Sequence, residues 1–203
     1  MIRTVTSEQV PGHPDYRHLS TIAGIDIDLR YATRDNFVGR DLYSPLDCAW
    51  LHREAAGAIE RAVALLAARR PGCRLLVLDA LRPHRVQEQL WEALAGTELR
   101  MYLADPARGS IHSYGMAVDV TITGEDGCEL DMGTGFDDMS DLSHPALERE
   151  MLAGGRLSPQ QAGNRQLLRD AMSGAGFAGI NSEWWHFDCG DRDAVRAGYI
   201  RVL

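Results

Sequence analysis

The sequence predicts a single domain of mixed α and β structure, in which helices pack on a β-sheet. A chain of 203 residues with 45% hydrophobic content can bury a full core, and its length favours one domain over residues 1–203. Apolar and charged residues alternate at positions 25–30, as in a half-buried strand. Apolar residues between positions 51 and 66 instead recur with the helical period, which predicts a helix packed on the sheet.

The N-terminal residues 1–20 are expected to form an extended, loosely held arm, because Pro11, Gly12 and Pro14 interrupt any regular pattern. A strand follows at residues 25–29. The next segment, residues 31–39, is polar, aromatic and turn-prone, and fits either a surface loop or one wall of a pocket.

A long helix is predicted after this segment. Ser44 has the character of a helix cap, and Pro45 suits the first helical position. The apolar stripe continues to Leu66, and Pro71 with Gly72 should end the helix.

The middle of the chain predicts a buried strand followed by a second helix. Residues 74–78 form a short, continuous apolar run, which is typical of a strand covered on both faces. The helix begins after Pro83 and turns Val86, Leu90 and Leu94 inward.

Two further strands are predicted, and both carry polar residues of interest. Residues 117–123 are rich in β-branched side chains, and residues 124–127 are expected to form a hairpin turn that leads to a short strand at 128–130. Residues 184–187 are aromatic and are expected to form a central strand.

The remaining C-terminal segments differ in regularity. Residues 131–157 are rich in Gly, Asp, Met and Ser, and irregular structure is expected there. Ser158 and Gln161 form a capping box for a helix that Gly174 or Gly176 should stop. Residues 191–203 are expected to close the domain at its periphery.

Charge excludes one class of partner. The net charge of −8 and a pI near 5.3 argue against nucleic acid, whose binding needs clustered Lys and Arg. No apolar run is long enough to predict a membrane span. A small molecule is the expected partner, and the sequence leaves the oligomeric state open.

The cysteines and the N-terminus favour a cytoplasmic protein. Cys48, Cys73, Cys128 and Cys189 are scattered, so a zinc site built from them is not expected, although their even number leaves a disulfide framework open. The first residues have no signal-peptide pattern, and the four thiols are therefore expected to be reduced.

Four residues in two short motifs predict a catalytic zinc site. His112 and Asp119 lie in the motif SxHxxGxAxD at positions 110–119, and Glu183 and His186 lie in EWWH. Catalytic zinc takes three protein ligands and leaves a position open for water or substrate. His112, Asp119 and His186 would be those ligands, and Glu183 would take a proton from the attacking water.

His144 is a weaker candidate for a fourth ligand, because three ligands and water already complete a catalytic site. Arg82 has two interpretations of equal weight. It could pair with Asp79 at the end of its strand, or its guanidinium could support the oxyanion formed during amide hydrolysis.

The motifs resemble those of the zinc D-alanyl-D-alanine dipeptidases of the VanX type. Beyond SxHxxGxAxD and EWWH, the matching stretches are YATxDNF at 31–37, DxxRP at 79–83, the Met132-Gly133 and Phe136-Asp137 pairs, and Ser143-His144. The resemblance implies an α+β fold with a mixed, mainly antiparallel sheet, related to D,D-carboxypeptidase and hedgehog zinc domains. It also implies hydrolysis of D-alanyl-D-alanine to two D-alanines.

By position, the resemblance implies zinc ligation by His112, Asp119 and His186, with Glu183 as the catalytic base and Arg82 stabilising the tetrahedral intermediate. Tyr31 and Ser110 correspond to positions that hold the amino end of the substrate. Ile111 and the Ala80-Leu81 pair depart from the family pattern, which bears on the fit of the substrate rather than on the metal.

Two rival functions would each require different features of the sequence. A zinc D,D-carboxypeptidase or wall-peptide endopeptidase of the same fold would act outside the membrane and would need an export signal. A zinc-bearing binding module without catalysis would need neither Glu183 nor Arg82.

Overall fold

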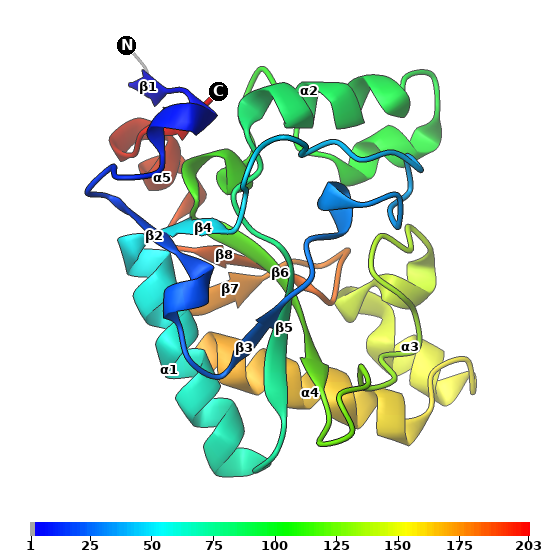
Figure 1. The fold of residues 1–203 in the computed structure, drawn as a ribbon. Helices are drawn as coiled ribbons and strands as arrows, with labels where there is room; N and C mark the ends of the chain where they lie inside the picture. Colours follow the sequence, from blue (N-terminus) through cyan, green and yellow to red (C-terminus); the bar gives the residue numbers. More distant parts are fainter. Residues whose placement is uncertain (1–2) are drawn as a thin grey trace.

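The computed structural model describes residues 3–203, and a five-stranded sheet lies at its centre (Figure 1). The strand order is β3 (Ile25–Ile27), β5 (Arg74–Asp79), β6 (Ala117–Thr123), β8 (His186–Cys189) and β7 (Phe177–Gly179). β3 and β5 are parallel, whereas the other three neighbouring pairs are antiparallel. The predicted mixed, mainly antiparallel sheet is therefore confirmed.

β6 is the middle strand, and all seven of its residues are buried. Its β-branched residues suit this position, because they pack well on a pleated surface that is covered on both faces. β5 is buried from Leu75 to Asp79, as its continuous apolar run predicts. A polar side chain on either strand is thus held in a rigid and dry part of the molecule.

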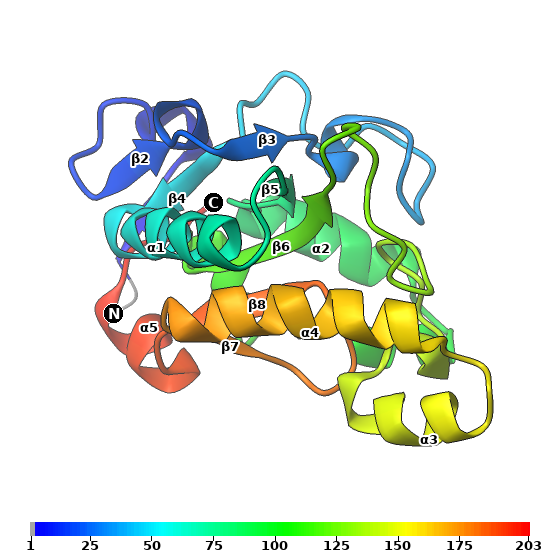
Figure 2. The same ribbon diagram turned by 90° about the horizontal axis from the view of Figure 1, so that it is seen from below.

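Helices cover both faces of this sheet. α1 (Arg53–Arg69) and α4 (Pro159–Gly174) lie side by side across one face, and α2 (His84–Ala93) lies behind the sheet in the same view (Figure 2). The inward residues predicted for the first two helices are buried, except that Val63 is only partly covered. On α4, Leu168, Ala171 and Met172 are buried and Leu167 is partly covered.

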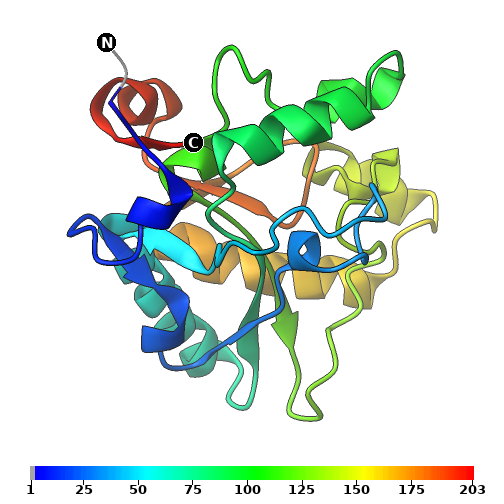
Figure 3. The same cartoon turned by 45° about the horizontal axis from the view of Figure 1, so that its top comes forward.

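The N-terminal segment is packed, so the prediction of a loosely held arm is wrong for residues 3–20; residues 1–2 of that arm lie outside the described residues. β1 (Thr4–Val5) pairs with β9 (Arg201–Val202), and β2 (Tyr16–His18) pairs with β4 (Trp50–His52) (Figure 3). Pro and Gly shape its turns, but buried side chains such as Leu19 fix it to the core.

The predicted start of the first helix is also wrong. α1 begins at Arg53, after β4, and not at Ser44. The side chain of Asp41 accepts hydrogen bonds from the backbone N–H groups of Tyr43 and Ser44, which makes a turn where a cap was expected. Tyr43 is fully buried and its hydroxyl donates to Asp79, so tertiary contacts decide the conformation here.

Three other segments differ from prediction in detail. Residues 131–157 contain a short helix, α3 (Glu148–Ala153), and two 3₁₀ turns, Asp141–Ser143 and Pro145–Leu147, within otherwise irregular structure. The turn at 124–127 forms, but residues 128–130 add only an isolated bridge between Thr123 and Glu129. β8 starts at His186, two residues later than predicted, and Trp184 and Trp185 are buried just before it.

The peripheral tail forms α5 (Arg192–Gly198) and β9. All four cysteines are free thiols. Within residues 3–203, every helix is too short or too polar to cross a bilayer.

The capping box of α4 gives a test of the fold. Ser158 Oγ accepts the N–H of Gln161, and the Gln161 side chain accepts the N–H of Ser158. Ser158→Ala is expected to lower the free energy of unfolding by about 1 kcal/mol in urea titrations, because one N–H group of the helix start loses its partner. Ser173→Ala, near the other end of α4, is the control and should change stability little, because its hydroxyl only bonds back to the Arg169 carbonyl. Equal effects of the two variants would contradict the capping role.

Candidate active site

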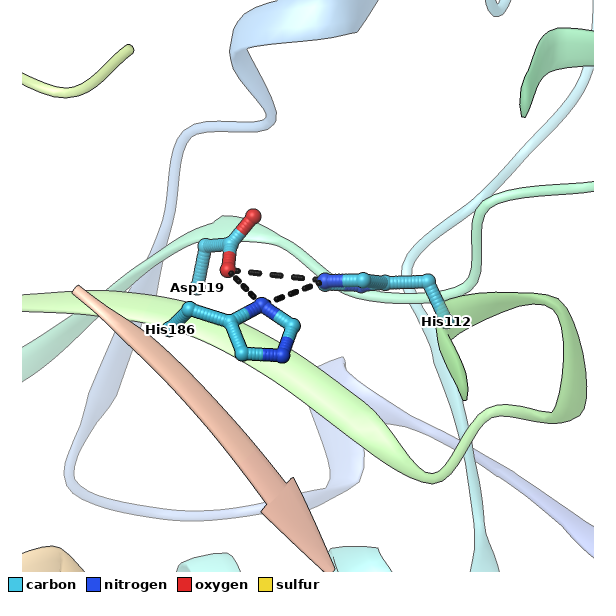
Figure 4. Close-up of side chains that lie close together, drawn as sticks. All are labelled: His112, Asp119 and His186. Carbon is cyan, nitrogen blue, oxygen red and sulfur yellow. Dashed lines mark hydrogen bonds and ion pairs between the residues drawn. The ribbon is translucent and has the colours of Figure 1, made fainter. Parts of the chain in front are cut away.

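His112, Asp119 and His186 meet at one point, as the sequence predicts (Figure 4). Asp119 projects from β6 and is paired in register with His186, the first residue of β8. His112 reaches them from a 3₁₀ turn, Ile111–Tyr114, just before β6. Gly115 follows with a φ of 66°, where a Cβ would lie 2.7 Å from the backbone nitrogen of His52, so only glycine lets the turn pass this close to β4.

The three donor atoms have the spacing of ligands around one small cation. His112 Nε2 lies 3.2 Å from His186 Nδ1 and 3.4 Å from Asp119 Oδ1, and the last two atoms are 2.9 Å apart. Ligands at about 2.0–2.1 Å from a tetrahedral zinc would be about 3.3 Å from one another. The donor set therefore fits a zinc-sized ion with little movement.

The other nitrogen of each imidazole is already engaged. His112 Nδ1 donates to the carbonyl oxygen of Ala80 at 2.8 Å, and His186 Nε2 donates to Asp188 Oδ1 at 3.0 Å. Arg192 in turn holds the second oxygen of Asp188 at 2.6 Å. Such contacts fix the tautomer, so that both rings present a lone pair to the shared point.

The electrostatics of this cluster favour positive charge. Burial alone would raise the pKa of Asp119, but His112 and His186 lie close enough to hold it below its usual value. Burial would lower the pKa of His186, yet its hydrogen bonds to Asp119 and Asp188 outweigh burial and raise the pKa to about 10. The negative charge of the Asp119 and Asp188 carboxylates can be balanced either by a proton on His186 or by a metal cation.

A pocket of about 270 Å³ opens beside these residues, and Glu183 lines it. Glu183 is half-buried in the loop before β8. Burial raises its pKa to about 7, while His186 acts to lower it and Asp119 to raise it. A carboxylate with a pKa near neutrality is suited to accept and return a proton.

Arg82 also lines the pocket, where it pairs with Asp79 and lies close to Asp119. Nε and Nη2 donate to Asp79 Oδ2 at 2.8 and 2.6 Å, which shows the predicted ion pair. Nη2 also lies 3.4 Å from Asp119 Oδ2, and Nη1 donates to Gln87 at 3.1 Å. The pair with Asp79 orients the guanidinium toward the three clustered residues.

Comparison with known proteins agrees with this geometry. The peptidase M15 family model, described as D-ala-D-ala dipeptidase, matches residues 14–202. This chain belongs to that family. The family and the enzyme class expected from the motifs are therefore confirmed.

Individual relatives cover most of the chain. The D-alanyl-D-alanine dipeptidase of Escherichia coli (strain K12) is 38% identical over 81% of this chain and 78% of its own length. The protein of the same name from Enterococcus faecium is 33% identical over 82% and 86%, and that from Enterococcus faecalis is 30% identical over 81% and 85%. A solved LdcB LD-carboxypeptidase aligns with 94% of this chain and 80% of its own at 14% identity, but its TM-score of 0.49 is too low to carry an argument.

Within this dipeptidase fold, Tyr31 and Ser110 both line the pocket. Tyr31 is buried at the aromatic cluster with Phe136, and its hydroxyl donates to Asp137 Oδ1 at 3.1 Å. Of the segment at 31–39, Tyr31 is the residue that lines the pocket, so the pocket-wall interpretation holds for this residue. Ser110 is buried at the start of the turn that carries His112.

Asp137 is a pocket residue that the sequence did not single out as a site residue. It has a φ of 60°, which is rare for a residue other than glycine, and its Oδ2 is buried without a partner among residues 3–203. Burial raises its pKa well above the usual value, against the lowering effect of Arg82. The only sequence signal was the Phe136-Asp137 pair inside an irregular segment.

His144 does not join the cluster. Its Nε2 lies 2.8 Å from the hydroxyl of Tyr102, another pocket residue that the sequence did not indicate. The metal-ligand group found in the described residues contains His112, Asp119 and His186 without it. The interpretation that His144 is no ligand is therefore the better one.

Asp188 provides a test of the cluster as a metal site. Asp188→Asn is expected to weaken binding of a divalent ion about 10- to 100-fold, because the amide no longer holds His186 with a charged acceptor. The measurement is competition with a chromophoric chelator. Asp193→Asn, at an exposed carboxylate on α5, is the control and should leave the affinity unchanged. An unchanged affinity in Asp188→Asn would contradict the assignment.

Proposed function

We propose that this chain is a zinc D-alanyl-D-alanine dipeptidase, with one zinc ion held by His112, Asp119 and His186. The observation that carries the proposal is the convergence of these three donors beside a pocket that also holds Glu183 and Arg82. Two imidazoles and one carboxylate, with an open side toward a pocket, are a donor set typical of catalytic zinc. The bound ion would polarise the scissile carbonyl and make water a better nucleophile at neutral pH.

Glu183 would carry the proton through the reaction. Its carboxylate takes a proton from the attacking water and returns it to the nitrogen of the leaving D-alanine. Its position in the pocket and its pKa near 7 support this role, because an acid–base group works best when its pKa lies near the working pH.

Arg82 would stabilise negative charge on the oxygen of the attacked carbonyl. Its contacts with Asp79, Gln87 and Asp119 account for four N–H groups of the five that a guanidinium carries. The contact with Asp119, at 3.4 Å, is long and can pass to a substrate oxygen. The ion pair with Asp79 fixes the guanidinium before the substrate binds, which lowers the cost of using it.

The free amino group of the substrate would bind at Asp137. Oδ2 of Asp137 has no other partner among residues 3–203, and Tyr31 holds the other oxygen in place. A carboxylate with a buried and unused oxygen is a strong acceptor for an ammonium group. Ser110, on the pocket wall, would assist at the same end of the dipeptide, as its position in the family pattern implies.

These features also separate the proposal from its rivals. A carboxypeptidase or endopeptidase must admit an acylated amine, which would leave the buried Oδ2 of Asp137 without a cationic partner. A non-catalytic zinc module has no need of Glu183 at the pocket. The cytoplasmic location expected from the sequence stays a prediction.

Glu183→Ala is expected to keep its metal and to lower kcat by roughly 10² to 10⁴-fold, because general acid–base groups contribute that much. Metal content and the release of D-alanine should be measured on the same preparation. Glu183→Gln, which keeps the size of the side chain without its basicity, serves as the matched variant and should be as impaired. Loss of metal from either variant would identify Glu183 as a ligand, and full activity would remove it from the mechanism.

The substrate assignment is tested with D-alanyl-D-alanine and its N-acetyl form. The free dipeptide should be cleaved, and the acetylated one should be rejected by up to roughly 10⁴-fold, because a buried polar group is left unpaired. Asp137→Asn should lose much of this preference. Comparable cleavage of both compounds by the unmodified chain, or removal of D-alanine from a wall pentapeptide, would favour the carboxypeptidase alternative.

A further inference from the structure

Two arginines on α5 line the same pocket and have no role in the reaction described above. Arg192 and Arg196 are four residues apart, so their side chains lie on one side of the helix and both reach the pocket. Arg192 is tied to Asp188 and so to the support of His186. Arg196 touches none of the three clustered residues in its hydrogen bonds.

Arg196 is held in place but its charge is only weakly balanced. Nε donates to the carbonyl oxygen of Gly109 at 3.1 Å, and Nη1 lies 3.2 Å from Asp193. The Arg196 side chain is 15% exposed, whereas that of Asp193 is 79% exposed and is a weak partner in water. Nη2 has no protein acceptor among residues 3–203.

The pocket is therefore charged unequally along its length. α5 and the segment that carries Asp137 lie at opposite ends of β8, in both Figure 1 and Figure 2. The end at Asp137 offers an unpaired carboxylate oxygen, whereas the end at α5 offers guanidinium groups. A dipeptide zwitterion has an ammonium group at one end and a carboxylate at the other.

We propose that Arg196, with Arg192 beside it, binds the free C-terminal carboxylate of the dipeptide. It would thereby select substrates in which the residue after the scissile bond is the last one. This rests on the proposed dipeptidase function and deepens it. Arginine presents two parallel N–H groups to a carboxylate, and a partly buried cation without a full counter-charge favours an anionic ligand. The amino end then selects for a free ammonium, and the carboxyl end selects for a free carboxylate.

The experiment compares D-alanyl-D-alanine with D-alanyl-D-alaninamide, which keeps the amino group and the scissile bond but lacks the carboxylate. The unmodified chain with its metal should favour the acid in kcat/KM by about 10- to 100-fold, the effect of a hydrogen bond between charged groups. Arg196→Met should raise KM for the acid by a similar factor with kcat nearly unchanged. It should leave the amide unaffected, so that the preference disappears.

Arg108→Met is the matched control. Arg108 also pairs with Asp193, but its side chain is 67% exposed and it does not line this pocket. This variant should keep the preference for the acid, whereas Arg196→Lys should keep part of it. Equal cleavage of acid and amide by the unmodified chain would overturn the inference alone. Equal losses on both substrates in Arg196→Met would also overturn it, because they would show a structural role.

The comparison of acid and amide on the unmodified chain needs no variant, so it decides the matter even where Arg196→Met does not fold. Failure of the unmodified chain to cleave either compound would overturn the proposed function itself, and the inference with it. The two failures are therefore distinguishable.

Discussion

The antiparallel pairing of β6 with β8 is the constraint on which the site depends. It sets Asp119 directly opposite His186, although 66 residues separate them in the sequence. Because side chains alternate along a strand, a slip of one residue would turn His186 and Asp188 away from Asp119 together. The buried, β-branched residues of β6 and the aromatic residues around β8 fix this register, so the core specifies the positions of Asp119 and His186.

Around this pair, the molecule concentrates carboxylates whose negative charge favours a bound cation. Asp119 and Asp188 both contact His186, and Glu183 and Asp137 are partly buried nearby in the same pocket. Burial raises the pKa of Glu183 and of Asp137, whereas the imidazoles lower that of Asp119. The same burial suits both the proton transfer that we propose for Glu183 and the ammonium site that we propose at Asp137.

The sequence predicted the site residues that lie within short motifs better than those that tertiary packing brings to the pocket. The trio of donors, the strand under Asp119 and the cap of α4 follow from local spacing and composition. Asp188 could have been found, since it lies two residues after His186 and thus on the same face of a strand.

Asp137 and Arg196 could not be found in this way. Asp137 lies in an irregular segment with positive φ, and Arg196 reaches the pocket only because α5 folds back against Gly109. The false start at Ser44 has the same origin: its cap-like sequence is overruled by the burial of Tyr43 against Asp79. Local signals predict elements, whereas the meeting of distant segments is decided by the packed core.

The most direct measurement is a zinc titration of the metal-free chain, followed by native mass spectrometry and D-alanyl-D-alanine hydrolysis at each step. We expect one zinc per chain, with activity that rises in proportion to the zinc-bound fraction and levels off at one equivalent. His186→Ala, titrated in parallel, should show neither binding nor activity. Full hydrolysis by the chelator-treated chain, or equal zinc binding by His186→Ala, would contradict this expectation.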